Sequence, residues 1–143
     1  MKISSRGRYG IRLLIDLAEH SGESHVSLAS IAERKKISLR YLEQVALILR
    51  RAGFIRSVKG ASGGYTLSRP PEEIIIGAAL RSLEGDMIVT DPPLPAVHET
   101  KFQRCIRAAL YERLNEQIAR VIDGKSLASL SGAAENEEHI DLK

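Results

Sequence analysis

Residues 27–53 read SLASIAERKKISLRYLEQVALILRRAG and contain two helix signals separated by a very short link. Ser27 and Ser38 each precede a run of apolar residues with helical spacing, as N-cap residues do. Gly53 follows the second run, where a glycine suits the position after a helix C-cap. Two helices joined by a turn of about three or four residues form a helix-turn-helix unit, so this stretch predicts one.

The apolar positions of this stretch predict which helix faces turn inward. They are Leu28, Ile31 and Ala32 on the first helix, and Leu42, Val45, Ala46 and Leu49 on the second. The opposite face of the second helix, near its start, then presents Ser38, Arg40, Tyr41, Glu43 and Gln44. Arginine can bond guanine bidentately, glutamine can pair with adenine, and serine or tyrosine can reach phosphates. This face therefore predicts contact with a DNA major groove.

Residues before this face are expected to meet the DNA backbone. Lys35 and Lys36 lie where the first helix would cross the phosphates, and Ser27 stands at a helix N-terminus with its amide donors. Two plainer interpretations stay open. Glu43 could accept from cytosine or be a solvated helix charge, and the unit could be a helical hairpin with one wet face.

A glycine-rich stretch, SVKGASGGYTL at residues 57–67, follows between two apolar segments. Residues 54–58 and 65–69 resemble short strands, so the stretch predicts the turn of a hairpin. A nucleotide-binding P-loop is excluded, because it needs a G-x-x-x-x-G-K-[ST] motif that leads into a helix. A plain hairpin needs a turn of only about two residues. After a helix-turn-helix, the hairpin is interpreted as a wing that places a cation in a narrow minor groove. The wing residues expected at DNA are Lys59, Gly60, Ser62, Gly63, Gly64 and Tyr65.

The flanking segments complete a winged helix-turn-helix domain of residues 1–85. Residues 5–20 predict a first helix with Ile11, Leu14, Ile15 and Ala18 on its inner face. Arg6 and Arg8, near its start, are expected to add phosphate contacts. Residues 76–85 predict a short helix. Residues 86–100 contain three prolines and predict an effector or linker loop, with one short strand as an open alternative.

A long helix is predicted from Lys101 to Asp123, about 33 Å long at the α-helical rise. Its apolar residues recur every four positions, at Phe102, Ile106, Leu110, Leu114, Ile118 and Ile122. Because such a stripe is an aggregation liability in a monomer, it predicts a dimer interface. One more helical turn after Ser126 completes a dimerisation region of residues 101–131. Residues 132–143 predict an acidic, mobile tail. The expected fold is therefore mainly α with a small β-hairpin wing and a long C-terminal dimerisation helix.

Charge and cysteine content narrow the class of protein. Residues 1–70 carry 13 Lys/Arg and five Asp/Glu, whereas residues 71–143 carry eight and 13. A basic half joined to an acidic half favours a polyanionic partner for the basic one. The single cysteine, Cys105, excludes an intrachain disulfide framework. No apolar run approaches the roughly 18 residues of a membrane span, which favours a cytoplasmic protein without a membrane partner. No triad or paired-carboxylate spacing indicates an enzyme.

Three stretches together resemble the Rrf-two family of bacterial winged-helix regulators: SSRGRYGIRLLIDLA at 4–18, residues 27–85, and LYERLNEQIARVIDGKSLASL at 110–130. The segments ISLRYLEQ and GGYTLSRPPEEI make the resemblance specific. The family includes iron–sulfur, nitric-oxide-sensing and cysteine-metabolism regulators. The resemblance implies a homodimer in which the long helices cross and each winged helix-turn-helix reads one half-site of a double-stranded operator.

The cysteine content bears on the effector. Cluster-binding members of this family place three cysteines in and before the long helix, and Cys105 matches the last of them. The segment DPPLPAVHETKFQ lacks the other two, and Ala108 stands where cluster-binding members have a histidine. The resemblance therefore implies a regulator with no iron–sulfur cluster and no other cofactor, most like the CymR branch of cysteine-metabolism repressors. Cysteine synthase is then a candidate partner.

Alternatives to this interpretation remain open. Cys105, on the apolar stripe, is expected to be a small core residue, and a redox-active thiol is the alternative. A metal-responsive regulator would need Cys105 from two chains or help from His98 and Glu99. A winged-helix module that binds protein rather than DNA is the alternative from another class.

Overall fold

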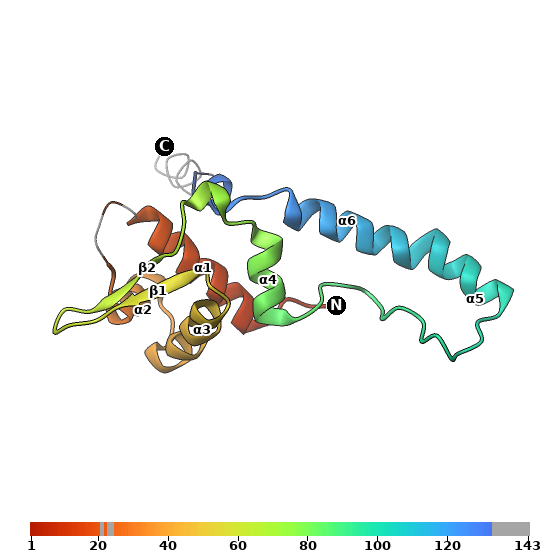
Figure 1. The fold of residues 1–143 in the computed structure, drawn as a ribbon, viewed down its shortest axis with the longest axis horizontal. Coiled ribbons are helices and arrows are strands. Elements are labelled where there is room, and N and C mark those ends of the chain that lie inside the picture. Colours follow the sequence, from red (N-terminus) through yellow and green to blue (C-terminus); the bar gives the residue numbers. More distant parts are fainter. Residues whose placement is uncertain (21, 23–24, 133–143) are drawn as a thin grey trace.

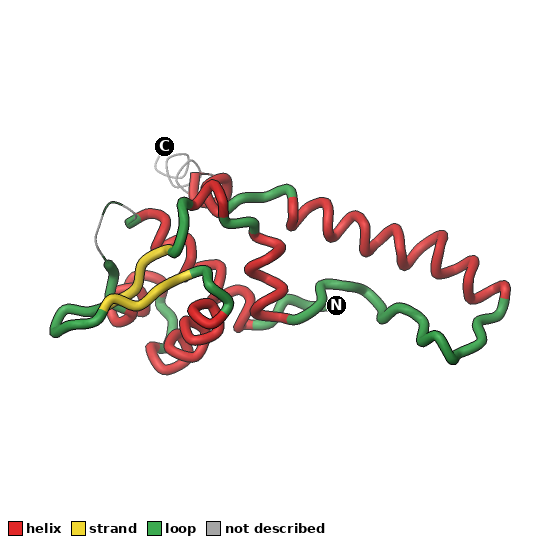
Figure 2. The backbone as a smooth tube through the Cα atoms, viewed as in Figure 1, coloured by secondary structure: helices red, strands yellow, loops and turns green. Residues whose placement is uncertain are grey.

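The computed structural model describes residues 1–20, 22 and 25–132 of the 143. It is mainly helical, with one two-stranded antiparallel hairpin, so the predicted fold class is confirmed. A body of packed helices carries the hairpin at one end, and a long helical segment projects from the other end (Figures 1 and 2). The predicted mobile tail lies outside the described residues, apart from Gly132.

The helix-turn-helix is built by α2 (Leu28–Lys35) and α3 (Leu39–Arg51). The Ser27 side chain accepts from the amide of Ser30, and the Ser38 side chain accepts from the amide of Tyr41, so both predicted N-caps are confirmed. The turn between the helices is tight because Lys36 adopts a left-handed conformation with φ of 53°. The link is therefore the short turn that the sequence indicates.

Helix α3 ends in a Schellman motif at the predicted glycine. Gly53 has φ of 86°, its amide donates to the Arg50 carbonyl over 3.0 Å, and the Phe54 amide donates to the Leu49 carbonyl over 3.0 Å. This motif turns the chain directly into β1, so the wing begins at a fixed angle to α3.

The hairpin consists of β1 (Ile55–Val58), which lies within the predicted strand, and β2 (Gly64–Leu67), which begins one residue before and ends two residues before the predicted 65–69. Its register pairs Ile55 with Leu67 and Val58 with Gly64. An antiparallel bridge joins Tyr65 to Val26, the residue just before the Ser27 cap. The sequence did not indicate this bridge, which anchors the wing to the start of α2.

The core is formed where α1 (Ser5–Glu19) packs against α3 and α4 (Ile76–Glu84). The prediction for α1 is partly wrong: Leu14 is buried as expected, but Ile11, Ile15 and Ala18 are only partly buried. Leu13 and Leu17 take their place at 0% and 2% exposed. Because α1 is covered from two sides, its buried stripe lies between the two neighbouring helices. The predicted inner residues of α3, Leu42, Val45, Ala46 and Leu49, are all buried.

The C-terminal segments differ from the prediction in one respect. Residues 86–100 form a loop without a strand, after which α5 (Lys101–Ile106) and α6 (Glu112–Asp123) are joined by a π-helical turn, Arg107–Tyr111. A short 3-10 helix, Pro71–Glu73, precedes α4, and residues 127–132 are helical. In the part of the chain that is described, no helix combines the length and apolar character needed to span a bilayer.

Candidate DNA-binding interface

The N-terminal half of α3 presents most of the predicted groove-reading side chains. Ser38, Arg40, Glu43 and Gln44 are all exposed. Tyr41 is half-buried, because its ring meets Tyr9 of α1 edge-on with centroids 5.3 Å apart. Four predicted residues therefore share an open polar face, while the Tyr41 ring also holds α3 against α1.

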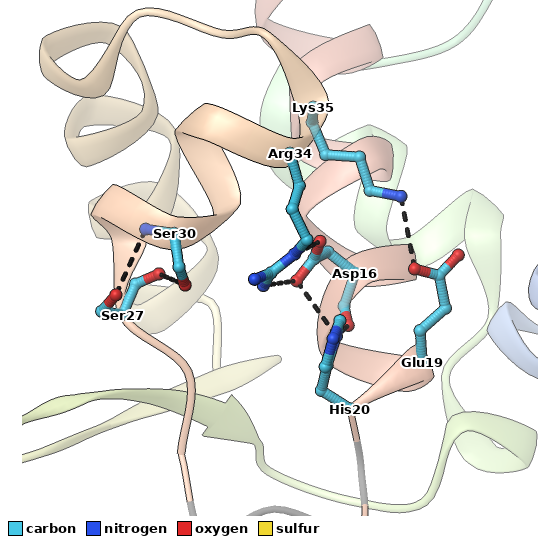
Figure 3. Close-up of polar contacts among 7 residues, drawn as sticks. All are labelled: Asp16, Glu19, His20, Ser27, Ser30, Arg34 and Lys35. Carbon is cyan, nitrogen blue, oxygen red and sulfur yellow. Dashed lines mark hydrogen bonds and ion pairs between the residues drawn. The ribbon is translucent and has the colours of Figure 1, made fainter.

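Ser27 and Ser30 form the start of α2 (Figure 3). The Ser27 hydroxyl accepts from the Ser30 amide over 3.2 Å, and the Ser30 hydroxyl donates to the Ser27 carbonyl over 2.8 Å. Ser27 is exposed, so its capping oxygen lies at the surface expected to meet a phosphate. The adjoining Lys35 is not freely available to a backbone, because its amine pairs with Glu19 over 3.3 Å.

An ion pair between the buried Asp16 and the partly exposed Arg34, which the sequence did not indicate, holds α2 on α1. Asp16 is fully buried, and Arg34 donates to its two carboxylate oxygens over 3.0 and 2.8 Å (Figure 3). The ring of His20 lies 3.4 Å from the same carboxylate and 2.8 Å from the Asp16 carbonyl. The available signal was the position of Asp16 among the apolar residues of α1. This bidentate contact fixes the orientation of α2, and therefore of the turn that carries α3.

The conformation and close packing of the wing's own backbone explain why glycine occupies these positions. Gly60 adopts φ of 132°, which side-chain-bearing residues rarely adopt, and a Cβ on Gly63 would lie 2.6 Å from the Val58 carbonyl. A Cβ on Gly64 would clash with the Val26 carbonyl. Lys59 and Ser62 are exposed at the turn, whereas Tyr65 is half-buried and its amide donates to Val26 over 2.8 Å. The glycines thus shape a hairpin that presents Lys59.

Arg6 and Arg8 are exposed in the first turn of α1, and the carboxylate of Glu84, on α4, caps the backbone amides at the start of the same helix. The Glu84 carboxylate accepts from the amides of Gly7 and Ser4 and from the Ser4 hydroxyl. Burial would raise the pKa of Glu84, but these hydrogen bonds and the charge of Arg6 outweigh it and hold the pKa below its ordinary value.

The predicted dimer stripe divides into two parts. Ile118 and Ile122 are partly buried against the core of their own chain. Phe102, Leu110 and Leu114 are 74%, 50% and 41% exposed, and Ile106 is half-buried; Val121, nearer the base of the helix, is 59% exposed. The base of this helix is fixed to α4 by Arg81, which donates to both carboxylate oxygens of Asp123 over 2.6 and 2.9 Å. The outer part of the stripe is therefore an uncovered apolar face on a firmly attached helix.

Residues around Cys105 do not fit an iron–sulfur cluster bound by one chain. Cys105 is exposed, so the expectation that it is a core residue is wrong for the chain described here. Both carboxylate oxygens of Glu99 accept from Arg107, at 2.9 to 3.2 Å. This pairing lowers the pKa of Glu99 and removes its oxygens from the set of free ligands. Cys105 and His98 then remain as candidate ligands in this segment, where a cluster of this kind takes about four.

Comparison with known proteins identifies the family. The family model described as Rrf2, an iron-dependent transcriptional regulator, matches residues 3–133. The HTH-type transcriptional regulator CymR of Bacillus subtilis (strain 168) is 36% identical over 138 residues, which cover 96% of this chain and 95% of the relative. The HTH-type transcriptional regulator IscR of Aliivibrio salmonicida (strain LFI1238) is 37% identical over 134 residues, which cover 91% and 77%.

A solved structure agrees with these sequence matches. The structure of CymR (YrzC), titled the global cysteine regulator of B. subtilis, superposes with a TM-score of 0.80 at 37% identity, and the match covers 93% of this chain and 98% of that one. These relatives are named transcriptional regulators and not enzymes. The chain belongs to the Rrf2 family of DNA-binding transcriptional regulators.

Proposed function

We propose that the chain is a cytoplasmic, homodimeric repressor that binds a palindromic operator through α3 and the wing. The observation that carries this proposal is the exposed polar start of α3, where Arg40, Glu43 and Gln44 stand free on a helix whose other face is buried. Arg40 can recognise guanine bidentately and Gln44 can recognise adenine. Lys59 reaches the adjoining minor groove from the wing, where the negative potential of a narrow groove attracts cations.

The exposed stripe of α5 and α6 supports the proposed dimer. A second copy that covers Phe102, Leu110, Leu114 and Val121 would remove a large apolar area from water. A two-fold dimer presents two recognition helices to half-sites about one helical turn of DNA apart, or a multiple of that spacing. The operator is therefore expected to be palindromic.

The proposed regulon is sulfur and cysteine metabolism, without an iron–sulfur cluster. Support comes from the likeness to the B. subtilis regulator whose title names cysteine and from the presence of one cysteine, Cys105, in the chain. Cysteine synthase is the partner protein that this branch of the family suggests. Repression rather than activation also follows from that branch.

The test is a selection from genomic DNA fragments with the purified protein, repeated with Arg40→Ala and with Arg113→Ala. Arg113 is an exposed arginine on α6, far along the chain from α3, and serves as the matched control. The wild type and the control should enrich one palindrome near sulfur-assimilation genes. Arg40→Ala should lose about 1–3 kcal/mol of binding free energy and relax one base position.

Three results would each contradict a part of the proposal. Enrichment of no sequence by the wild type would shift the interpretation to a winged helix that binds protein. An Arg40→Ala variant with the wild-type base preference would remove Arg40 from the groove-reading set. A purified protein with iron–sulfur absorption near 400 nm would contradict the absence of a cluster.

A further inference from the structure

A pocket of about 310 Å³ lies between the loop after α4 and the start of α6. Its walls come from two segments, residues 86–93 and residues 107–115. The lining residues are Asp86, Ile88, Thr90, Asp91, Pro92, Pro93, Arg107, Tyr111, Glu112 and Asn115. Figure 1 shows the loop after α4 running outward beside the projecting helix to the start of α5, so the two segments that line the pocket lie outside the winged-helix body. None of the predicted DNA-binding residues lines it.

The pocket has the size and composition of a small-molecule site. Its volume is at the lower end of the range in which small ligands bind, and apolar groups from Ile88, Pro92, Pro93 and Tyr111 contribute to its walls. The Val89 amide donates to the Asn115 side chain over 2.7 Å, which ties the loop to α6 beside the pocket. The Thr100 capping box and the Glu99–Arg107 ion pair fix the far end of the same loop. Both ends of the loop are thus attached to the helix that forms the opposite wall.

The charge of the pocket is negative once its internal ion pairs are counted. Arg107 is its cation, and that guanidinium is paired with Glu99 and with Glu112. The hydrogen bonds that Arg107 donates to these two carboxylates raise its pKa above the ordinary value, so its charge stays fixed. The Asp86 and Asp91 side chains form no hydrogen bond or close ion pair with a residue that the structure describes, although the charge of Asp86 also acts on Arg81 of α4. Two carboxylates therefore remain available for a cation.

We propose that this pocket binds a small organic cation, an aliphatic amine or guanidinium compound whose carbon chain lies on the apolar wall. The ammonium or guanidinium group would pair with Asp86 and Asp91, and Tyr111 adds an aromatic face that attracts cations. A single metal ion fits less well. Among the described residues, three ligand groups within 4.8 Å of one another occur at Asp16, Glu19 and His20, which are not in this pocket.

The pocket also connects two parts of the molecule that a ligand would affect together. Asp86 follows directly on α4, whose Glu84 closes the start of α1, while Arg107 and Glu112 lie on the helix proposed to form the dimer. The binding inference itself does not depend on the proposed function. It can be tested without DNA, so failure of one leaves the other standing.

The experiment is a calorimetric titration of the full chain, in the oligomeric state in which it purifies, with putrescine, spermidine and agmatine, and with glutarate as an anion of similar length. We expect saturable binding of at least one amine with one site per chain and no binding of glutarate. Asp91→Asn and Asp86→Asn should each weaken this binding by about tenfold or more, because each removes a charge-assisted hydrogen bond. Glu72→Gln is the matched control, since it makes the same change of charge at an exposed residue outside the pocket. It should leave the affinity unchanged.

Three outcomes would overturn the inference. The first is no saturable heat with any of the three amines. The second is an equal loss of affinity in Glu72→Gln, which would indicate unspecific counterion binding. The third combines two measurements: no amine binds, and Asp91→Asn self-associates more weakly than wild type in sedimentation. That result would mean that a basic side chain of a second copy occupies the pocket.

Discussion

At the scale of single residues, two carboxylates determine how the DNA-binding unit is held together. Asp16 is fully buried and its charge is met by Arg34, so this contact positions α2 against α1. Glu84 binds free amides of the first turn of α1, where a negative charge is also favoured by the helix dipole. Neither residue was predicted as a site. Both position the elements that carry the predicted site residues.

Arg34→Met should destabilise the fold by about 3 kcal/mol, because it leaves Asp16 charged, buried and without its strongest partner. Chemical denaturation measures this free energy. The double variant Asp16→Asn, Arg34→Met should recover part of the loss. Arg40→Met changes an exposed arginine and should stay within about 0.5 kcal/mol of wild type. A loss of equal size in both single variants would contradict the role of the ion pair.

Glu84→Gln tests the cap of α1 through its pH dependence. The folded-state pKa of Glu84 lies below its ordinary value of 4.5, so the carboxylate stabilises the fold above that pH. This contribution is lost as the pH falls through the lowered pKa. The variant should therefore be less stable than wild type by about 1 kcal/mol near neutral pH. The difference should shrink when denaturation is measured well below pH 4.5. A difference that does not change with pH would refute the argument.

At the scale of elements, the sequence predicted what depends on local chemistry. Ser27, Ser38 and Gly53 mark helix ends through bonds to nearby backbone groups, and the structure confirms each of them. The features that it did not predict depend on distant partners. The bridge from Val26 to Tyr65, for example, joins segments about 40 positions apart in the sequence. The centre of the α1 stripe was misjudged for the same reason, since two later helices cover it. The π turn at 107–111 was missed for a different reason, because the apolar spacing of this segment also fits a regular α-helix.

Gly64→Ala should weaken the proposed DNA binding through the wing. A Cβ at this position would clash with the Val26 carbonyl and push β2 away from the start of α2. We expect the loss of affinity to be larger than for Ser57→Ala, an exposed change on the facing strand. Titration of a labelled operator measures the affinity of each variant. Equal affinities would mean that the bridge does not position the wing.

Lys59→Ala tests the wing tip separately from its scaffold. Because Lys59 is proposed to contact the DNA backbone or minor groove without reading a base pattern, its loss should weaken binding about uniformly across sequences. The slope of affinity against salt should become shallower by about 1. A change in base preference with an unchanged slope would contradict this assignment.

At the scale of the whole molecule, the exposed apolar face of the projecting helix bears on whether the protein is a monomer or a dimer. Its exposed residues, led by Phe102, face away from the core, while its base is fixed by the Arg81–Asp123 ion pair. The sequence predicted the stripe, but it could not show that Ile118 and Ile122 serve the chain's own core. That division arises because α6 packs on α4 at its base.

Leu114→Glu should convert the proposed dimer into a monomer without unfolding it, because Leu114 is 41% exposed in the single chain. Sedimentation equilibrium measures the oligomeric state, and circular dichroism measures whether the variant remains folded. Glu116→Lys makes a larger change of charge on another face of the same helix and should leave the dimer intact. If both variants stay dimeric, the interface lies elsewhere.

The most direct test of the account is a titration of the selected palindrome with wild-type protein at several salt concentrations, beside a scrambled duplex of equal length. We expect two chains to bind each palindrome, with a clear preference over the scrambled duplex. With roughly six to ten phosphate contacts, affinity should fall by about 10³–10⁵ between about 50 and 200 mM salt. Equal affinity for both duplexes, or binding that does not respond to salt, would contradict an operator-binding dimer.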